Sequence, residues 1–222
     1  MIVLKNKNLV VINKPAGMPS QSDPSGDKDA MTLTSELLRE MGESGDLFLI
    51  HRLDRVVGGL MVFARNKSCA AALSSAVADR AMTKEYFAVV PGQPEGGVME
   101  DYLYKDATLG KSFVTDRKRN GVKLARLEYR LCHIVETERG ELSLVRVKLD
   151  TGRFHQIRCQ FASRMMPLVG DKKYGSRDFL AKTPALFAAR LSFDYDGEHF
   201  DVSAMPDRER HPWSLFSEDK YQ

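Results

Sequence analysis

The sequence predicts an α+β protein built on a mixed, mainly antiparallel sheet with flanking helices. Segments with the apolar pattern of β-strands outnumber segments with helical spacing, and they mostly follow one another instead of alternating with helices. Of the 222 residues, 43% are hydrophobic and 28% are charged, as in an ordinary folded protein of one domain or of two joined lobes.

Eight segments have the composition of strands. The two longest, 124–135 and 142–149, alternate apolar and polar residues, and we expect them to pair through a turn at 137–140 in the middle of the sheet. The other predicted strands are 2–4, 9–12, 60–64, 86–90, 186–193 and 199–203. Segment 14–26, with three prolines and two glycines, is predicted to be a loop.

Three segments have the apolar spacing of helices. The first is predicted to have Thr32 as its N-cap and to end near Gly42, and the second to begin at Ser68 and end near Arg80. The third is predicted to begin at an N-cap, Thr151. Its apolar face is expected to consist of Phe154, Ile157, Phe161 and Met165.

Composition disfavours several classes of protein. No apolar run approaches the roughly 18 residues of a membrane-spanning helix, and lysines interrupt the apolar start, so we expect a cytoplasmic protein that does not contact a membrane. The five histidines lack metal-site spacing, so we expect no metal. The three cysteines are too few and too far apart for a disulfide framework, which predicts reduced, unreactive thiols at Cys69, Cys132 and Cys159.

Charge is unevenly distributed along the chain. Between Lys111 and Arg126 there are six bases and one acid, whereas Asp23 to Asp46 holds seven acids and two bases, although the net charge is only +3. Such segregation is consistent with a basic face that binds a polyanion. A solvated charged loop is the alternative, and it is the one that charge alone favours.

Three segments place arginine beside a group that could react. The first is His51-Arg52-Leu53-Asp54-Arg55, where the flanking guanidiniums should keep the Asp54 carboxylate ionised, although an exposed salt-bridge cluster would look the same. The second is Lys84-Glu85-Tyr86, in which a tyrosine at the start of a strand is more often packing than a catalytic group. The third is the predicted start of the last helix, TGRFHQIR.

Several motifs resemble, in chain order, those of the RluA family of pseudouridine synthases. They are NKPAGMP, HRLD with the glycines after it, KEYFAVVPG, LDTGRFHQIR and VGDKKYG, and they extend from about Asn13 to Tyr174. HRLD alone would occur by chance on the order of once in a thousand chains of this length, so the ordered set is not accidental.

The resemblance implies the pseudouridine synthase fold over residues 1–222, as a single catalytic domain of two joined lobes with a central catalytic cleft. It also implies an enzyme that isomerises specific uridines of structured RNA, either ribosomal or transfer RNA, without a cofactor. Because the chain begins almost at the first predicted strand, we expect no S4 domain, and we expect a monomer.

Individual roles follow from the same resemblance. Asp54 matches the catalytic aspartate, Tyr86 the tyrosine that stacks on or deprotonates the target base, and Arg158 the arginine paired with the aspartate. Arg52 matches the arginine that occupies the space of the flipped nucleotide, and Ile157 the apolar residue beside Arg158. Asp54 either adds to C1′ of the ribose or removes the 2′ proton, and the motifs leave both routes open.

A second group of residues is expected to contact the substrate less directly. Those expected near the target nucleotide are His51, Arg153, His155 and Gln156. Those expected to bind RNA phosphates are Arg117, Lys118 and Arg119, at a predicted hairpin tip before Asn120-Gly121, together with Lys172 and Lys173.

The sequence departs from the family pattern in three places. Val57-Gly58 replaces the usual Thr-Ser after HRLD, Gln160 replaces a usual histidine, and LFAARLSF lacks another. These changes put turnover and substrate choice in more doubt than the type of reaction. A catalytically silent RNA-binding relative therefore remains an alternative, and a metal-dependent RNA hydrolase is disfavoured by the absence of ligand spacing.

Overall fold

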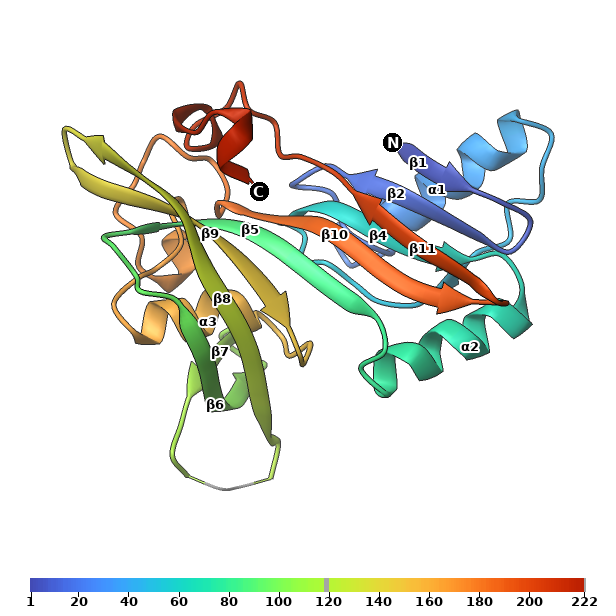
Figure 1. Cartoon of the computed structure of the whole chain (residues 1–222). Coiled ribbons are helices and arrows are strands. Elements are labelled where there is room, and N and C mark those ends of the chain that lie inside the picture. Colours follow the sequence, from blue (N-terminus) through green and yellow to red (C-terminus); the bar gives the residue numbers. More distant parts are fainter. Residues whose placement is uncertain (118–119, 222) are drawn as a thin grey trace. The chain divides into compact units, whose positions relative to one another are not determined.

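The computed structural model describes residues 1–117 and 120–221 (Figure 1). The chain forms two compact units. The first consists of Met1–Lys84 and Phe187–Pro206, and the second of Glu85–Leu186 and the residues from Asp207 on. The second unit therefore interrupts the first in the sequence.

The first unit contains a mixed sheet. Its strands are β1 (Ile2–Lys5), β2 (Leu9–Lys14), β3 (Phe48–Leu49), β4 (Gly58–Ala64), β10 (Leu186–Tyr195, whose first residue belongs to the second unit) and β11 (Glu198–Ser203). The order is β1-β2-β4-β10-β11, with β3 against the end of β4. All pairs are antiparallel except β4 with β10, which is parallel. The predicted α+β class with a mixed, mainly antiparallel sheet is confirmed.

The core of the first unit explains why β4 is apolar throughout. All seven residues of β4 are buried, so the strand is covered on both faces and does not alternate. The helix α2 (Lys67–Ala78) packs on one face through Cys69 and Leu73, which contact Leu60 and Val62 of β4 in one cluster (Figure 1). Asn66 is the N-cap of α2, and its side chain accepts the Cys69 N–H at 2.9 Å.

The predicted cap of the first helix is wrong by three residues. The helix α1 spans Ala30–Glu40, and its N-cap is Asp29, whose carboxylate accepts both the N–H and the hydroxyl of Thr32. A carboxylate is the stronger acceptor for the exposed amides at a helix start, so Thr32 becomes a partner of the cap and lies inside the helix.

The second unit contains an antiparallel sheet. Its strands are β5 (Thr83–Pro91, whose first two residues belong to the first unit), β6 (Gly97–Asp106), β7 (Lys111–Val114), β8 (Val122–Thr137) and β9 (Gly140–Leu149). They lie in the order β5-β9-β8-β6-β7. The predicted pairing of the two long strands is confirmed, since β8 and β9 pair from Thr137↔Gly140 to Leu127↔Leu149, with a bulge between Leu131 and His133.

Two strands of this sheet were not predicted. In β6 only Met99 and Leu103 are buried, and the other side chains are largely charged or exposed, so the pattern of a half-buried strand is faint. The strand β7 has only four residues. Long-range pairing with β8 selects the conformation of β6, and local sequence does not reveal such pairing.

The third helix begins later than predicted. The helix α3 spans Gln156–Ser163, and its first flanking residue is His155, in the left-handed conformation with φ 52°. Thr151 instead donates its hydroxyl to the side chain of Gln156 at 2.7 Å and accepts the Arg126 N–H. Phe154 therefore precedes the helix, and Met165, beyond its end, is 87% exposed, so neither belongs to a buried helical face.

The basic segment after β7 is not a hairpin tip. The strands β7 and β8 flank β6, so residues 115–121 connect two strands that are not neighbours. Arg117 is exposed on this connection, and Lys118 and Arg119 lie outside the described residues.

The short helices of the second unit are η1 (Lys172–Tyr174), η2 (Trp213–Leu215) and η3 (Glu218–Tyr221). The last of them packs the ring of Tyr221 edge-on against Phe87 of β5, with 5.0 Å between ring centroids. In the described part of the chain, no helix is long and apolar enough to cross a membrane.

Candidate active site

The segment His51–Arg55 is fastened to the loop that follows β2. Ser20, which is 6% exposed, accepts the N–H of Leu53 at 3.1 Å and donates its hydroxyl to the Leu53 carbonyl at 2.8 Å. Gly17 donates its N–H to the Arg55 carbonyl at 2.8 Å. These bonds fix the backbone on both sides of Asp54, because both of its neighbours are held.

Lys14, the last residue of β2, lies beneath the same segment and is fully buried. Its ammonium donates to the carbonyls of Met18 at 2.7 Å, Pro15 at 3.1 Å and Arg55 at 3.2 Å. Burial lowers the pKa of Lys14 to about 8, while the negative charge of Asp54 opposes that change. Lys14 is thus a charged neighbour of Asp54 and a brace for its loop.

Asp54 is partly buried, and its carbonyl accepts the Val57 N–H at 2.9 Å, which closes a turn before β4. After Val57, Gly58 has little room for a side chain and Gly59 has none. A Cβ on Gly59, which has φ +118°, would lie 2.3 Å from the Ala188 carbonyl oxygen, and one on Gly58 would lie 3.2 Å from the Lys14 oxygen. The departure at Val57-Gly58 is therefore accompanied by close packing of this turn.

Arg55, which flanks Asp54, is tied to the acidic stretch that begins at Asp23. Its guanidinium pairs with Asp27, lies 3.6 Å from an Asp23 oxygen and donates to the Gly17 carbonyl at 3.1 Å. The charge cluster expected at HRLDR is thus partly a structural clamp. Arg52, on the other side, is exposed.

His51 faces the sheet of the first unit. Its Nε2 accepts the N–H of Val62 in β4 at 3.3 Å. Burial, with a smaller contribution from the positive charge of Lys84, lowers the pKa of His51 to about 3, so the ring is neutral at physiological pH. This position anchors the start of HRLD to β4, while the substrate contact expected of His51 stays a prediction.

In the second unit, Arg158 on α3 forms a buried ion pair that the sequence did not predict. Its Nε and one terminal nitrogen, Nη2, donate to the two carboxylate oxygens of Asp171 at 2.7 Å and 2.9 Å. The two side chains are 5% and 1% exposed. Ile157 beside it is buried. Asp171 lies within the motif VGDKKYG, so the sequence marked it as a candidate functional residue. The motif did not indicate that its partner is Arg158.

His155 and Tyr174 form a second contact around the start of α3. The His155 Nδ1 lies 3.1 Å from the Tyr174 hydroxyl, which also accepts the N–H of Ser112 at 2.8 Å. Burial and the charges of Arg158 and Lys173 lower the pKa of His155 to about 3. The imidazole is therefore neutral, and the residue adopts a left-handed backbone conformation that costs energy for a side chain with a Cβ.

Gln156 and Arg153 hold this turn to the sheet. The Gln156 side chain donates to the Arg126 carbonyl at 3.1 Å and accepts the Arg153 N–H at 3.0 Å. Arg153 in turn donates from Nε to the Leu124 carbonyl at 2.8 Å. Both residues therefore join the α3 turn to β8, whatever contacts they make with substrate.

Tyr86 lies on β5 opposite Val147 of β9, and it is 7% exposed. Its neighbour Glu85 accepts a hydrogen bond from the Nε of Arg146 at 2.7 Å, and Arg146 also lies over the Phe87 ring. Tyr86 thus lies in a paired strand, next to the residue that forms this ion pair.

Gln160, where the family usually has histidine, is completely buried on α3. Its amide donates to the Asp101 carboxylate at 2.7 Å, and Asp101 also binds Arg164 through both of its oxygens. Gln160, in place of the usual histidine, therefore takes part in a polar network that joins α3 to β6.

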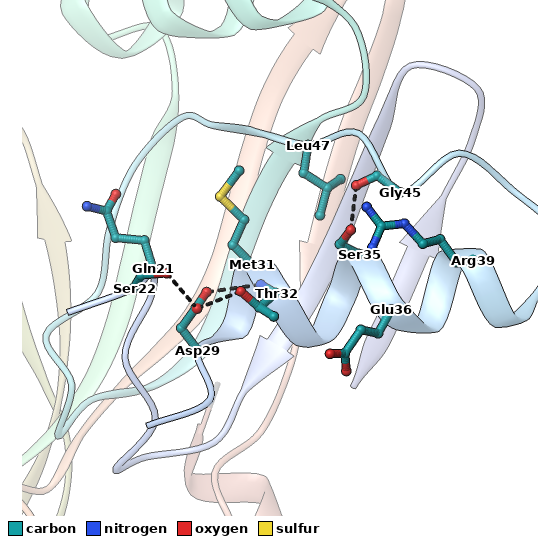
Figure 2. A pocket seen from close by; sticks show the side chains of 10 residues that line it. All are labelled: Gln21, Ser22, Asp29, Met31, Thr32, Ser35, Glu36, Arg39, Gly45 and Leu47. Carbon is teal, nitrogen blue, oxygen red and sulfur yellow. Dashed lines mark hydrogen bonds between the residues drawn. The ribbon is translucent and has the colours of Figure 1, made fainter. Parts of the chain in front are cut away.

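A pocket of about 490 Å³ lies elsewhere in the first unit, beside α1 (Figure 2). Figure 2 shows the Asp29 cap with Thr32 and Ser22 at one end and the hydrogen bond from the Ser35 hydroxyl to the Gly45 carbonyl at the other. None of the residues expected in the active site lines this pocket.

Comparison with known proteins assigns the family. The model of the RNA pseudouridylate synthase family matches residues 8–163, which include the Lys14 brace, HRLD and α3. This chain belongs to that family. The match confirms the resemblance of the motifs and spans both compact units.

Several RNA pseudouridylate synthase relatives are similar over most of the chain. The ribosomal large subunit pseudouridine synthase C of Rickettsia felis is 31% identical over 187 residues, 84% of this chain and 59% of that protein. Synthase D of Zymomonas mobilis is 30% identical over 91% of this chain and 68% of that protein. The chain thus spans about 60% of the length of the first of these relatives.

Solved structures of the family have the same fold. The human RNA pseudouridylate synthase domain containing 4 matches with a TM-score of 0.76 and 25% identity, over 94% of this chain and 89% of that one. The human RNA pseudouridylate synthase domain containing 1 matches with a TM-score of 0.75 at 23% identity, over 93% of this chain and 83% of that one. The predicted pseudouridine synthase fold is confirmed.

Proposed function

We propose that the chain isomerises specific uridines in structured RNA to pseudouridine, with Asp54 as the catalytic carboxylate. The observation that best supports this proposal is that hydrogen bonds hold the backbone beside Asp54, in a chain that belongs to the RNA pseudouridylate synthase family. Lys14 and Ser20 hold the backbone on both sides of Asp54, which pre-organises a reactive side chain. Such rigidity is what a carboxylate needs if it is to meet a nucleotide in one geometry.

The reaction breaks the bond between N1 of uracil and C1′ of the ribose and forms a bond between C5 and C1′. Atoms balance without a co-reactant, because the proton lost from C5 is matched by one gained at N1, and we propose that no cofactor takes part. Asp54 either adds to C1′ or removes the 2′ proton, and Tyr86 accepts the C5 proton or stacks on the base.

We propose that Arg158 is the ion-pair partner of Asp54 as well as of Asp171. Arg52, which is exposed, would fill the space of the flipped nucleotide and offset part of the few kcal/mol of unstacking. Ile157 would be the apolar residue of the substrate site that packs beside Arg158. The remaining substrate contacts are assigned to His51, Arg153, His155 and Gln156, and the phosphate contacts to Arg117, Lys118, Arg119, Lys172 and Lys173.

The proposed substrate is ribosomal RNA, with transfer RNA as the alternative. The names of the curated relatives support the large ribosomal subunit, since these proteins are called ribosomal large subunit pseudouridine synthases. We further propose that residues 1–222 act as one catalytic domain of two joined lobes, as a cytoplasmic monomer.

A large-subunit ribosomal RNA transcript labelled at uridine tests the proposal. The transcript is incubated with the protein in EDTA, digested to nucleotides and analysed for pseudouridine. Pseudouridine formation is the expected result. RNA binding without pseudouridine formation would instead identify a catalytically silent RNA-binding relative. That is the alternative raised by the replacement of Thr-Ser with Val57-Gly58. Cleavage of the RNA that requires added metal would contradict both.

A further inference from the structure

Two lysines of the second unit lie over aromatic rings, and a third donates to a backbone carbonyl of the turn between β6 and β7. The Lys105 ammonium on β6 lies 4.5 Å from the ring centroid of Phe154, and that of Lys111 on β7 lies 4.8 Å from that of Tyr174. Lys173, next to Tyr174 on η1, donates to the Gly110 carbonyl at 3.0 Å, in the turn between β6 and β7. An aromatic face attracts an ammonium without neutralising its charge.

The rings and the turn form one connected cluster. Phe154 stacks on His155 with 3.9 Å between centroids, and the His155 ring meets Tyr174 edge-on. The Ser112 hydroxyl donates to the Phe154 carbonyl at 2.6 Å, and the Ser112 N–H donates to the Tyr174 hydroxyl. These bonds join β7, the α3 turn and η1. Lys105 and Lys111 contact rings of this cluster, and Lys173 contacts the turn before β7.

Among the described residues, no ion pair neutralises these three lysines. Within residues 1–117 and 120–221, no carboxylate oxygen pairs with the ammonium of Lys105, Lys111 or Lys173 at 4.0 Å or less. Asp106, opposite Lys111 in the ladder, accepts the Leu109 N–H instead. Many other cations of the chain do have acidic partners.

The surface also exposes aromatic rings beside the lysines. Phe154 is 36% exposed and Phe113 is 38% exposed, and Lys111 lies 5.4 Å from the Phe113 centroid. Cations that alternate with exposed rings suit single-stranded nucleic acid, since phosphates meet the ammonium groups and unpaired bases stack on the rings. An acidic protein segment would use the cations but would gain little from the rings.

We propose that this lysine–aromatic surface, defined as Lys105, Lys111, Lys173, Phe113 and Phe154, binds single-stranded RNA that flanks the target uridine. The proposal rests on the proposed function, because it assigns a place to the substrate strand beyond the reacting nucleotide. It also moves the main phosphate contact from the connection around Arg117 to the face built by β6, β7 and the α3 turn.

The test is a salt titration of binding to a fluorescent single-stranded oligouridine of about 20 nucleotides, with all variants in an Asp54→Asn background. The triple variant Lys105→Gln, Lys111→Gln and Lys173→Gln should flatten the slope of log affinity against log salt by about 2, because each phosphate neutralised contributes about 0.7. The matched control, Lys7→Gln, Lys67→Gln and Lys148→Gln, removes the same charge from exposed sites. Its slope should stay within about 0.5 of the parent. If the plots of log affinity against log salt have the same slope for both triple variants, the proposal is overturned.

A second pair of variants separates RNA from other polyanions. Phe113→Leu with Phe154→Leu should weaken oligouridine binding at least about fivefold, whereas Phe113→Tyr with Phe154→Tyr should restore it. Polyglutamate that competes as well as oligouridine at equal charge would overturn the assignment to RNA. If the triple lysine variant loses its fold, as judged by circular dichroism, the single variants replace it, each with an expected flattening of about 0.7.

These outcomes are distinguishable from failure of the proposed function. Binding is measured with a protein in which Asp54 is replaced, so it needs no turnover. Normal pseudouridine formation with parallel salt lines would overturn only the surface. A flattened slope without any pseudouridine from the native chain would overturn only the proposed activity.

Discussion

Arg158 and Asp171 face each other side-on, with Nε on one carboxylate oxygen at 2.7 Å and Nη2 on the other at 2.9 Å. Both side chains are almost completely buried. The ion pair ties the first turn of α3 to the residue before η1 and fixes the plane of the guanidinium. It therefore sets the direction in which Arg158 can present its remaining N–H groups.

Replacement of Asp171 by Asn should destabilise the second unit by about 3 kcal/mol, because breaking a buried ion pair on one side leaves a desolvated charge. Chemical denaturation measures the change. Asp201→Asn is the control, since Asp201 binds Arg190 through both oxygens in the same way but at the surface. Its cost should stay below about 1 kcal/mol. Equal losses of unfolding free energy in the two variants would mean that burial of the Arg158–Asp171 pair adds nothing to the cost of breaking it.

Replacement of Lys14 by Met should lower both stability and activity, because three backbone carbonyls lose an ammonium donor beneath the Asp54 loop. We expect a loss of about 3 kcal/mol at pH 7 by denaturation. Lys7→Met, at an exposed position, should change stability by less than about 0.5 kcal/mol. A stable Lys14→Met protein with normal turnover would show that the loop does not depend on this brace.

The same lysine predicts a pH dependence with a defined sign. Its pKa is about 8 in the folded chain and 10.5 ordinarily, so between these values the unfolded state binds a proton that the native state does not. The free energy of unfolding of the wild type, relative to Lys14→Met, should therefore rise from pH 8 to 10 by up to about 1.4 kcal/mol per pH unit. A difference that is flat or falls with pH would show that Lys14 keeps its proton.

Replacement of Gly59 by Ala should unfold the first unit far more readily than an equivalent change at Gly17. Both glycines have positive φ, but a Cβ at Gly59 would overlap the Ala188 carbonyl, whereas one at Gly17 meets nothing within 4 Å. We expect costs of about 3 kcal/mol or more and about 1 kcal/mol respectively, measured by thermal or chemical unfolding. Similar costs would indicate that β4 and β10 adjust without strain.

Replacement of Asp54 by Asn keeps the size and polarity of the side chain and removes its charge. Pseudouridine formation should fall by at least about a thousandfold in single-turnover assays, while RNA affinity stays nearly unchanged. Asp46→Asn, an exposed carboxylate of the same unit, serves as the control and should retain normal turnover. Residual activity of the Asp54 variant above about a tenth of wild type would remove Asp54 from its assigned role.

Replacement of Tyr86 by Phe preserves the ring and deletes the hydroxyl. If Tyr86 accepts the C5 proton, product formation should drop by about a hundredfold while RNA binding persists. Release of tritium from uridine labelled at C5 follows that step directly. Unchanged release in Tyr86→Phe, together with a defect in Tyr86→Leu, would leave Tyr86 with stacking alone.

Patterns in the sequence were sufficient to predict the fold class, the family, most strands and the position of the HRLD segment. Those conclusions rest on local patterns, such as the continuous apolar run of β4 and the alternation of β8 and β9. Such patterns involve residues that are neighbours in the sequence, so they can be recognised without the structure. The start of α2 was predicted at Ser68, one residue after its first residue, Lys67, although Asn66 was not identified as its N-cap.

The contacts between side chains, by contrast, depend on the folded chain. Thr151 looked like a helix cap, but Gln156 and Arg126 engage it, and α3 begins after it. Arg158 was predicted to pair with Asp54, which stays a prediction, and the fold also gives it Asp171. The energy of a buried ion pair depends on what desolvation of the two charges costs and on geometry shared by residues far apart in the chain, and a pattern read along the sequence contains neither.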